Sequence, residues 1–258
     1  MSRVSIEITD HVAHVTLTRG DKMNALDPAM LEAIAQAGAD VNRDDVRAVV
    51  LSGEGRAFCA GLDVASFASV GANPAALLER TYGRTNLWQQ VCMVWRDLPV
   101  PVIAALHHTC FGGGMQIALG ADIRVAAPDT KMSIMEMKWG LVPDMGSMVL
   151  LPRLMPGDVM RRLIYTGEIF AAEQALGWGL VTELSDGPLT RARALADDIA
   201  AKSPSAVRAA KALAAIAETQ GEDAVLLAES RLQADLIGKP HQMEAVLANM
   251  QKRAPVFK

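Results

Sequence analysis

Two short apolar runs constrain the fold of this chain more than any other feature. VRAVVLSGEG (residues 46–55) and PVPVIAAL (residues 99–106) are almost wholly apolar and are bounded by glycine or proline. A run of this kind, without alternation, is typical of a strand that is buried on both faces of a parallel sheet. Parallel strands need long crossover connections, which are usually helical. The sequence therefore predicts an α/β fold.

The first hundred residues supply the segments around these runs. VSIEITDHVAHVTLTR (residues 4–19) alternates β-branched and polar residues, which predicts a strand hairpin. Asp27 as N-cap, with Pro28 at the first helical position, predicts a helix that ends near Gly38. RAFCAGLDVASF leads into another helix, and residues 74 to 97 have the pattern of one long helix.

The second half becomes mainly helical. DIRVAAPDTKMSI (residues 122–134) predicts a strand, a turn and a strand. From about Pro143 helices follow, interrupted by one strand at residues 179–185. Residues 187–253 are rich in Ala, Leu, Glu, Lys and Gln, which favours helix. We therefore expect a main domain over residues 1–186 and a helical region over residues 187–258.

Composition excludes several classes of protein. The 25 Lys and Arg residues against 29 Asp and Glu give a net charge of -4, which provides no global attraction to nucleic acid or anionic membranes. No apolar run reaches the roughly 18 residues of a membrane span, and the N-terminus lacks the pattern of a signal peptide. With 51% hydrophobic residues, the chain is too apolar to be disordered. We expect a soluble, cytoplasmic protein.

The cysteines point to the same compartment. Cys59, Cys92 and Cys110 have neither an even number nor the spacing of metal ligands. We interpret them as reduced thiols of a cytosolic protein. The sequence therefore predicts neither a metal site nor a disulfide framework.

Three consecutive glycines, Gly112 to Gly114, separate the second apolar run from a short helical segment. Glycines that open a helix let the backbone approach a ligand, and the first N–H groups of the helix favour negative charge. The sequence lacks G-x-G-x-x-G and the lysine of G-x-x-x-x-G-K-[ST], so neither nucleotide fingerprint is met. The glycines thus serve a phosphate, a developing oxyanion, or only the close packing of helix on strand.

Seven motifs in a fixed order are spread along the chain from residue 22 to residue 258. They are KMNALD (22–27), GRAFCAGLD (55–63), PVIAALHHTCFGGG (101–114), ADIRVAA (121–127), EMKWGLVPDMGSMVLLPRL (136–154), LIYTGEIFAAEQALGWGLVTEL (163–184) and QKRAPVFK (251–258). Together they resemble the crotonase, or enoyl-CoA hydratase/isomerase, family. The strings IAALHHTCFGGG and VPDMGS are most similar to its dienoyl-CoA isomerase branch.

The resemblance implies a fold, a substrate and an assembly. The core would be the crotonase (ClpP/crotonase-like) spiral of repeated ββα units, and the C-terminal helices would form a homotrimer or a dimer of trimers. The substrate would be an acyl-CoA thioester of fatty acid metabolism, converted by a lyase or isomerase. Coenzyme A would enter as part of the substrate, with no separate cofactor and no metal ion.

The resemblance also assigns backbone and coenzyme A contacts. The family's oxyanion hole uses two backbone N–H groups, which by motif belong here to Leu62 and Gly113. When a proton moves at the carbon next to a thioester, negative charge develops on the thioester oxygen, and two such donors stabilise it. The contacts with coenzyme A carried over by motif are Lys22, Met23, Ala25, Ala60, Asp63, Val64 and Phe257; Lys22 is also explicable as a solvent-facing charge.

The acid and base follow less directly. Where the family's hydratases carry two glutamates, this chain has Gln116 and Glu136. Glutamine cannot exchange a proton near neutral pH, although its amide can hold a water molecule or the thioester. Asp144 stands where the dienoyl-CoA isomerases carry an aspartate, although those enzymes also keep an acid at the position of Gln116. The apolar neighbours of Glu136 would raise its pKa. The resemblance therefore implies proton transfer by Glu136 with Asp144.

Other interpretations remain open from the sequence. In a conventional 2-enoyl-CoA hydratase, Gln116 and Glu136 would jointly position water. In a catalytically silent paralogue, the chain would only bind acyl-CoA. Asp144 could also serve as the cap of a helix that begins after Pro143.

The remaining candidates are interpreted as structural or left open. His107 and His108 precede the glycines, but no G-x-S-x-G elbow or orienting acid accompanies them, so we expect both to be structural. His108 stands where the family usually has glycine, which predicts a strained backbone with positive φ. Trp88, Met93 and Trp95, in the segment from 66 to 95, either wall the acyl pocket or belong to the core.

Overall fold

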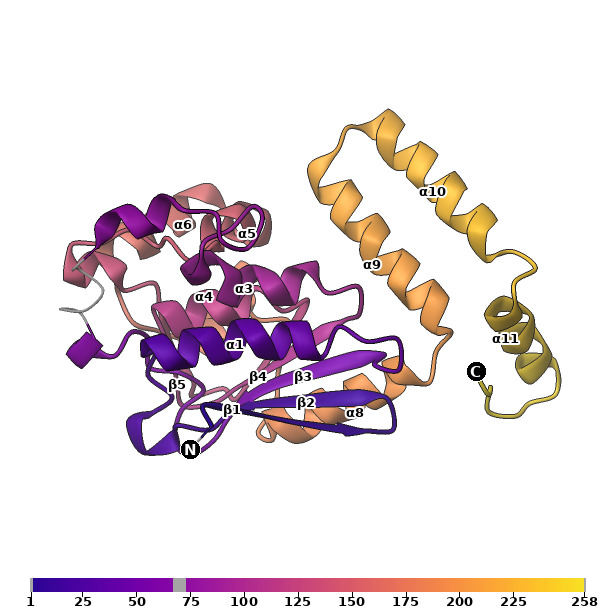
Figure 1. Ribbon diagram of the computed structural model, residues 1–258, viewed down its shortest axis with the longest axis horizontal. Helices are drawn as coiled ribbons and strands as arrows, with labels where there is room; N and C mark the ends of the chain where they lie inside the picture. Colours follow the sequence, from indigo (N-terminus) through magenta and orange to yellow (C-terminus); the bar gives the residue numbers. More distant parts are fainter. Residues whose placement is uncertain (1, 67–72, 258) are drawn as a thin grey trace.

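A six-stranded sheet in the order β1-β2-β3-β4-β6-β9 forms the centre of the computed structural model, which describes residues 2–66 and 73–257 (Figure 1). β1 pairs antiparallel with β2, and every later pair is parallel. Both apolar runs form central strands of this sheet, so the predicted α/β class and the hairpin are confirmed. The strands are β1 (Val4–Thr9), β2 (Val12–Leu17), β3 (Ala48–Gly53), β4 (Val102–Leu106), β6 (Ile123–Ala126) and β9 (Glu183–Leu184).

A second, three-stranded sheet lies beyond the carboxyl ends of the first. Its order is β5-β7-β8, with β5 (Thr109–Phe111) parallel to β7 (Lys131–Ser133) and β7 antiparallel to β8 (Phe170–Ala171). The chain passes from β5 through Gly112 directly into α4 (Gly113–Leu119). Gly112 therefore joins the strand to the buried helix, and Gly113 and Gly114 form the start of that helix.

Helices cover both faces of the six-stranded sheet (Figure 1). α1 (Pro28–Asp40), α3 (Leu87–Asp97) and α4 pack on one face, within the larger apolar core. α8 (Pro188–Ala200) packs on the other face through Ala192, Ala196 and Ala200. These small side chains let α8 lie close to the strands, with Val12, Val50, Ile103 and Val125 beneath it. The helices α5 (Ser147–Leu154), α6 (Gly157–Thr166) and α7 (Ala172–Trp178) follow the glycine segment.

Three C-terminal helices project from this body (Figure 1). They are α9 (Pro204–Thr219), α10 (Glu222–Leu236) and α11 (Pro240–Met250). In the single chain Ala248 is buried, whereas α9 and α10 contain no buried residue. The predicted helical content is confirmed. α8 packs on the sheet, and the projecting part begins at Pro204.

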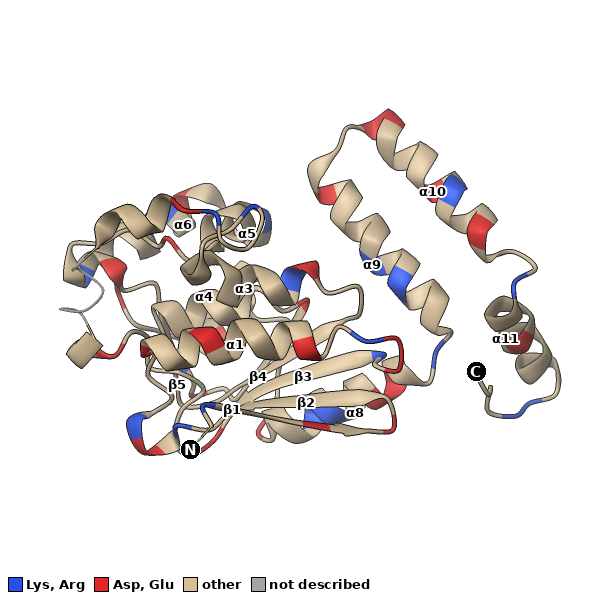
Figure 2. Cartoon of the chain, viewed as in Figure 1, with Lys and Arg blue, Asp and Glu red and all other residues tan. Residues whose placement is uncertain are grey.

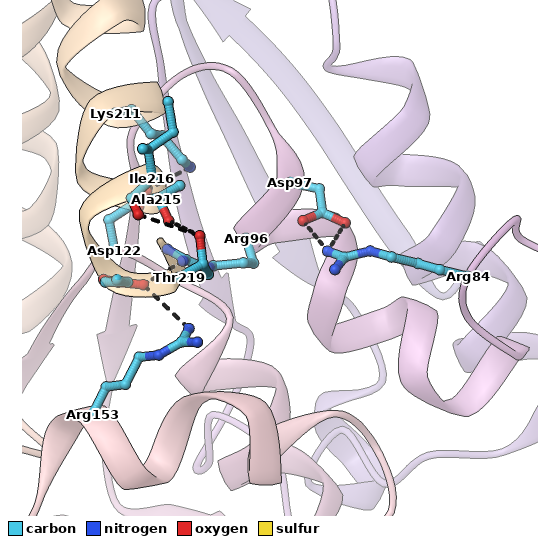
Figure 3. Close-up of polar contacts among 10 residues, drawn as sticks. Arg84, Arg96, Asp97, Asp122, Arg153, Lys211, Ala215, Ile216 and Thr219 are labelled. Carbon is cyan, nitrogen blue, oxygen red and sulfur yellow. Dashed lines mark hydrogen bonds and ion pairs between the residues drawn. The ribbon is translucent and has the colours of Figure 1, made fainter. Parts of the chain in front are cut away.

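Polar groups attach α9 to the body (Figure 3). Lys211 Nζ donates to Asp122 Oδ2 at 2.7 Å, to Val100 O at 2.8 Å and to Trp95 O at 3.3 Å. Glu218, near the end of α9, accepts from Arg96 and, at 3.5 Å, from Arg153. A cavity of about 420 Å³ lies beside these groups.

Some predicted element boundaries were wrong. The long helix expected from 74 to 97 is a 3-10 turn, Pro74–Leu78, followed by irregular chain and then α3. Gly83 takes φ +75° in between, and Asn86 starts α3 anew with a capping box to Gln89. Likewise, the strand expected at 179–185 is reduced to β9.

Two helix predictions in the first half also need adjustment. The predicted first helix starts as expected, with Asp27 Oδ1 accepting the Met30 N–H, but it continues to Asp40. After CAGLD the described chain has a 3-10 turn, Val64–Ser66, and the rest of the expected helix falls on residues 67–72, outside the described residues.

Basic and acidic residues are interspersed over the elements (Figure 2). α9, for example, carries Arg208, Lys211 and Glu218 within one helix. No helix among the described residues has the length and apolarity to cross a bilayer. The three cysteines are free and buried, and burial raises the pKa of Cys59 and Cys92 to about 12.

Candidate active site

A cavity of about 130 Å³ lies where the start of α4 meets the CAGLD segment and the chain before α5. Its wall is mostly apolar, and its two ionisable side chains, among the described residues, are both acidic. It is lined by Ala60, Gly61, Leu62, Val64, Trp88, Gly112, Gly113, Met135, Glu136, Trp139, Leu141, Asp144 and Met145. The cavity thus brings together the glycine triplet, CAGLD and both predicted carboxylates.

Two residues that line this cavity, Leu62 and Gly113, have backbone N–H groups with no hydrogen-bond partner among the described residues. Leu62 and Leu26 form an isolated parallel β-bridge, in which the Leu26 N–H donates to Gly61 O and the Asp63 N–H donates to Leu26 O. The Leu62 N–H takes no part in this bridge and points away from it. The Leu62 N–H has no backbone partner within the described part of the chain. Gly113 opens α4, where N–H groups lack intrahelical partners. A Cβ on Gly61 would lie 3.6 Å from Gly113 N, so the two segments are adjacent.

The three glycines serve different purposes. A Cβ on Gly114 would lie 2.5 Å from Cys59 O, and one on Gly113 would lie 2.7 Å from Leu26 Cδ1. The helix packs so closely on its neighbours that both positions favour glycine. Gly112 takes φ +50°, a conformation that favours glycine. The glycine triplet therefore serves both the close packing of the helix and the access of the backbone to the cavity.

Glu136 has one carboxylate oxygen engaged and one without a partner. It starts a 3-10 turn, Glu136–Trp139, and is 8% exposed. Its Oε1 accepts from Gln116 Nε2 at 2.6 Å, whereas the buried Oε2 has no hydrogen-bond partner among the described residues. Burial raises the pKa of Glu136; hydrogen bonds, including that from Gln116, oppose this, and the charge of Asp144 adds to it. A buried carboxyl with a raised pKa and a spare oxygen can exchange a proton.

Gln116 has no spare acceptor. Its Oε1 accepts from Met145 N at 2.9 Å and from Ser147 Oγ at 2.7 Å, which occupies both lone pairs of the carbonyl. Gln116 is 1% exposed, so solvent does not compete for these bonds. Its amide is a fixed donor to Glu136.

Asp144 lies on the cavity wall but is more exposed than Glu136. Burial of part of the carboxyl raises its pKa. The N-cap of α5 is Gly146, and no side chain caps that helix. The interpretation of Asp144 as a helix cap is therefore wrong, and its carboxyl is available to the cavity.

The residues assigned to coenzyme A divide into two groups. Ala60 and Val64 line the cavity, and Ala60 N–H donates to Met23 O at 2.9 Å, which places the turn of Lys22, Met23 and Ala25 beside it. The Asp63 side chain is instead engaged within the protein, since its Oδ2 pairs with Arg19 at 2.7 Å and this bond lowers its pKa.

The structure does not bring Phe257 to this cavity. Its ring lies against His241, with the Arg47 guanidinium 5.9 Å from the ring centre. Arg47 precedes β3, whereas CAGLD follows β3, so Phe257 is at the opposite end of that strand.

Other candidates take structural positions. His107 Nε2 lies 3.0 Å from Gly55 O, and His108 has the predicted positive φ, +49°. Neither histidine lines the cavity. Of the three candidates for the acyl wall, Trp88 lines the cavity, while Met93 and Trp95 belong to the core.

Sequence reasoning missed several residues that shape the site. Asn24 is buried and its amide donates to the carbonyls of Glu54, Ala57 and Phe58, which holds the segment before CAGLD. Asn24 stands inside the KMNALD motif, so a buried polar role could have been suspected. Met145 and Ser147 also stand inside a motif, but no local pattern links them to Gln116, about thirty residues earlier.

Comparisons with known proteins give consistent results. The family described as Enoyl-CoA hydratase/isomerase matches residues 7–258. The (E)-benzylidenesuccinyl-CoA hydratase of Thauera aromatica is 32% identical over 99% of this chain and 98% of its own. The mitochondrial Delta(3,5)-Delta(2,4)-dienoyl-CoA isomerase of Mus musculus is 34% identical over 80% of this chain and 67% of its own. The crystal structure of an enoyl-CoA hydratase from Bacillus anthracis matches with a TM-score of 0.90 and 29% identity, covering 99% of each chain. The crotonase fold expected from the motifs is confirmed.

Proposed function

The chain belongs to the enoyl-CoA hydratase/isomerase family and is an enzyme that acts on acyl-CoA, and we propose that it moves protons along the acyl chain with Glu136 as the main acid–base group. Asp144 assists from the same cavity. The N–H groups of Leu62 and Gly113 hold the thioester oxygen while negative charge develops on it. The expected reaction is therefore double-bond isomerisation through an enolate.

The hydrogen bonding of Gln116 carries this proposal. Water addition by a pair of side chains needs a second group that accepts from, or exchanges protons with, the water. Gln116 Oε1 already accepts two internal hydrogen bonds, and Nε2 donates to Glu136. This observation favours a single carboxyl at that end of the cavity and argues against the conventional hydratase mechanism.

The unpartnered oxygen of Glu136 argues against a silent binding protein. Burying a carboxyl without full hydrogen bonding destabilises the folded state. Glu136 Oε2 is buried and unpartnered among the described residues. A protein that only bound acyl-CoA would gain nothing from this arrangement, whereas a proton-transfer enzyme needs it.

We also propose that the acyl group is uncharged and small. Glu136 and Asp144 are both acidic and no cation lines the described part of the cavity, so a second carboxylate on the substrate would be repelled. The volume of about 130 Å³ is close to the roughly 150 Å³ of an apolar cavity that holds benzene.

Coenzyme A contacts and assembly complete the proposal. Lys22, Met23, Ala25, Ala60 and Val64 would contact coenzyme A, which enters as part of the substrate, with no separate cofactor. A homotrimer or dimer of trimers is supported by apolar side chains exposed on α10 and α11, and light scattering would test it. These side chains are Leu226, Leu227, Met243, Val246, Leu247 and Met250. The division at residue 187 and the cytoplasmic location stay predictions.

The deciding experiment is mass spectrometry of short 2-enoyl-CoA and dienoyl-CoA substrates after incubation with the protein in heavy water. We expect deuterium in the acyl chain without addition of water, and no deuterium with Glu136→Gln. Addition of water as the main reaction would contradict the proposal and make Gln116 a water-holding residue. Binding without any exchange would favour the silent paralogue.

Gln116→Glu gives a second test. Met145 N–H and Ser147 O–H would donate equally well to a carboxylate, so the site has donors ready for a second acid. We expect this variant to gain water addition, measured with the same 2-enoyl-CoA. A variant that folds but remains unable to add water would mean that the cavity lacks another requirement of hydratases.

A further inference from the structure

A buried network fixes the direction in which the Gln116 amide points. Its oxygen accepts from Met145 N and Ser147 Oγ, and its nitrogen donates to Glu136 Oε1. Ser147 is 0% exposed and Gln116 is 1% exposed. The oxygen and the NH2 group of the amide are similar in shape, so these hydrogen bonds alone select one orientation of the amide over the flipped one.

The turn that supplies both donors is held by its own packing. Gly146, between Met145 and Ser147, takes φ +93°, a conformation that favours glycine. A Cβ there would lie 3.1 Å from Met93 Cγ in the core. The donors therefore come from a packed turn at the start of α5.

We propose that Ser147 is a positioning residue for the proton transfer: with the Met145 N–H it keeps the Gln116 nitrogen on Glu136, so that Oε1 stays occupied and Oε2 carries the proton. The inference rests on the proposed role of Glu136. A reversed amide would place its oxygen where the nitrogen now lies, 2.6 Å from Oε1. Two acceptors would then face each other unless Glu136 held a proton on Oε1, the wrong oxygen for catalysis.

The same network acts on the charge of Glu136. The hydrogen bond from Gln116 opposes the rise that burial causes in the pKa of Glu136. Asp144 is the other titratable group that acts on Glu136, and Lys138, two residues on, lies over the Trp139 ring. Loss of the Ser147 hydroxyl leaves the Met145 N–H as the remaining donor to the Gln116 oxygen, so the amide is held less firmly. Its hydrogen bond to Glu136 then weakens, which raises the pKa of Glu136 further.

The test is the pH profile of deuterium exchange for Ser147→Ala. We expect the midpoint of the acidic limb to rise by about one pH unit, the size of effect that one charge-assisted hydrogen bond supports. Below that midpoint kcat should fall by about tenfold with KM unchanged. Ser52→Ala is the matched control, because Ser52 is also buried but its hydroxyl contacts Thr16 instead. A wild-type profile in folded Ser147→Ala would overturn the proposal.

Two further measurements keep the test decisive. If Ser147→Ala does not fold, Ser147→Cys, with a weaker donor of similar size, should show a smaller shift in the same direction, and no shift would overturn the proposal. Infrared difference spectra against pH, with Glu136→Gln to assign the band, report the protonation of Glu136 without substrate. If the wild type proves inactive, the proposed function fails, yet the infrared shift in Ser147→Ala still supports or overturns the role of Ser147.

Discussion

The cavity around Glu136 and the attachment of α9 around Lys211 both hold a charged side chain that is largely removed from solvent. At α9 the Lys211 ammonium makes three hydrogen bonds, one of them to Asp122 (Figure 3). Asp122 Oδ2 also accepts the Val102 N–H at 2.7 Å. In the cavity, Glu136 Oε2 has no partner among the described residues. The larger cavity, of about 420 Å³, lies beside the satisfied charges, and the smaller one lies beside the unsatisfied oxygen. His14 Nδ1 and Trp95 Nε1 are also buried without a partner, but Glu136 Oε2 is the one such carboxylate oxygen among the described residues. An unpartnered carboxylate oxygen, rather than cavity size, therefore distinguishes the candidate site.

The largest expected effect comes from Glu136→Gln. If Glu136 is the acid–base group, kcat/KM should fall by about 10²–10⁴-fold, because glutamine cannot exchange the proton. Gln116 can still donate to the new amide oxygen, so thermal unfolding should show a folded protein at least as stable as the wild type. Near-wild-type exchange of deuterium would refute the assignment of Glu136.

Lys211→Met tests the other region. Its removal leaves the Asp122 carboxylate, 24% exposed, without its cation. We expect the free energy of unfolding, measured in urea, to fall by about 2–3 kcal/mol. This is less than for a fully buried ion pair, because solvent reaches part of Asp122. Activity per folded molecule should not change. In Lys211→Met with Asp122→Asn much of the loss should return, since no unpaired carboxylate remains. Arg43→Met, in an exposed pair with Asp45, is the control and should have no measurable effect. Lost activity with unchanged stability would contradict the comparison.

Asp144→Asn should have an intermediate effect within the cavity. Asp144 is more exposed than Glu136 and has a secondary role in the proposal, so we expect about a tenfold loss of isomerisation, less than for Glu136→Gln. The rate of deuterium exchange at the acyl carbon that exchanges its proton with Glu136 should not change. An equal loss for both variants would mean that the two carboxyls act as one unit.

The smallest expected effect is on stability against pH. Burial raises the folded-state pKa of Glu136 above its ordinary 4.5, so the folded state binds this proton more tightly than the unfolded state does. Its contribution to stability is then fully present below pH 4.5 and is lost as the pH rises through the folded value. Glu136→Gln should therefore gain stability over the wild type as the pH increases in urea unfolding. A difference that stayed constant with pH would indicate an ordinary pKa.

The sequence predicts this fold best where burial leaves a local pattern. The apolar runs became β3 and β4 because strands buried on both faces need no polar residues. The interval from 74 to 97 was misinterpreted because helical spacing continues across Gly83, whose positive φ a periodicity does not reveal. The capping of α3 by Asn86 depends on a single side chain and is equally easy to miss.

The site was predictable in part. The order of motifs led to Glu136, Asp144, Leu62 and Gly113, and the structure gathers all four around one cavity. The orientation of Gln116 was not predictable, because it depends on contacts between α4 and the start of α5. Phe257 was assigned from resemblance alone, and no property of its neighbours in the sequence reports that it lies beyond the opposite end of β3.

The packing of α8 on the sheet has a consequence for synthesis on the ribosome. Val12, Val50 and Ile103 emerge early, but the alanines of α8 that cover them are translated after residue 190. Throughout that interval the nascent chain presents one uncovered apolar sheet face, the kind of surface that aggregates. Chains arrested before α8 should therefore depend on chaperones, and those released just after residue 200 should depend on them much less.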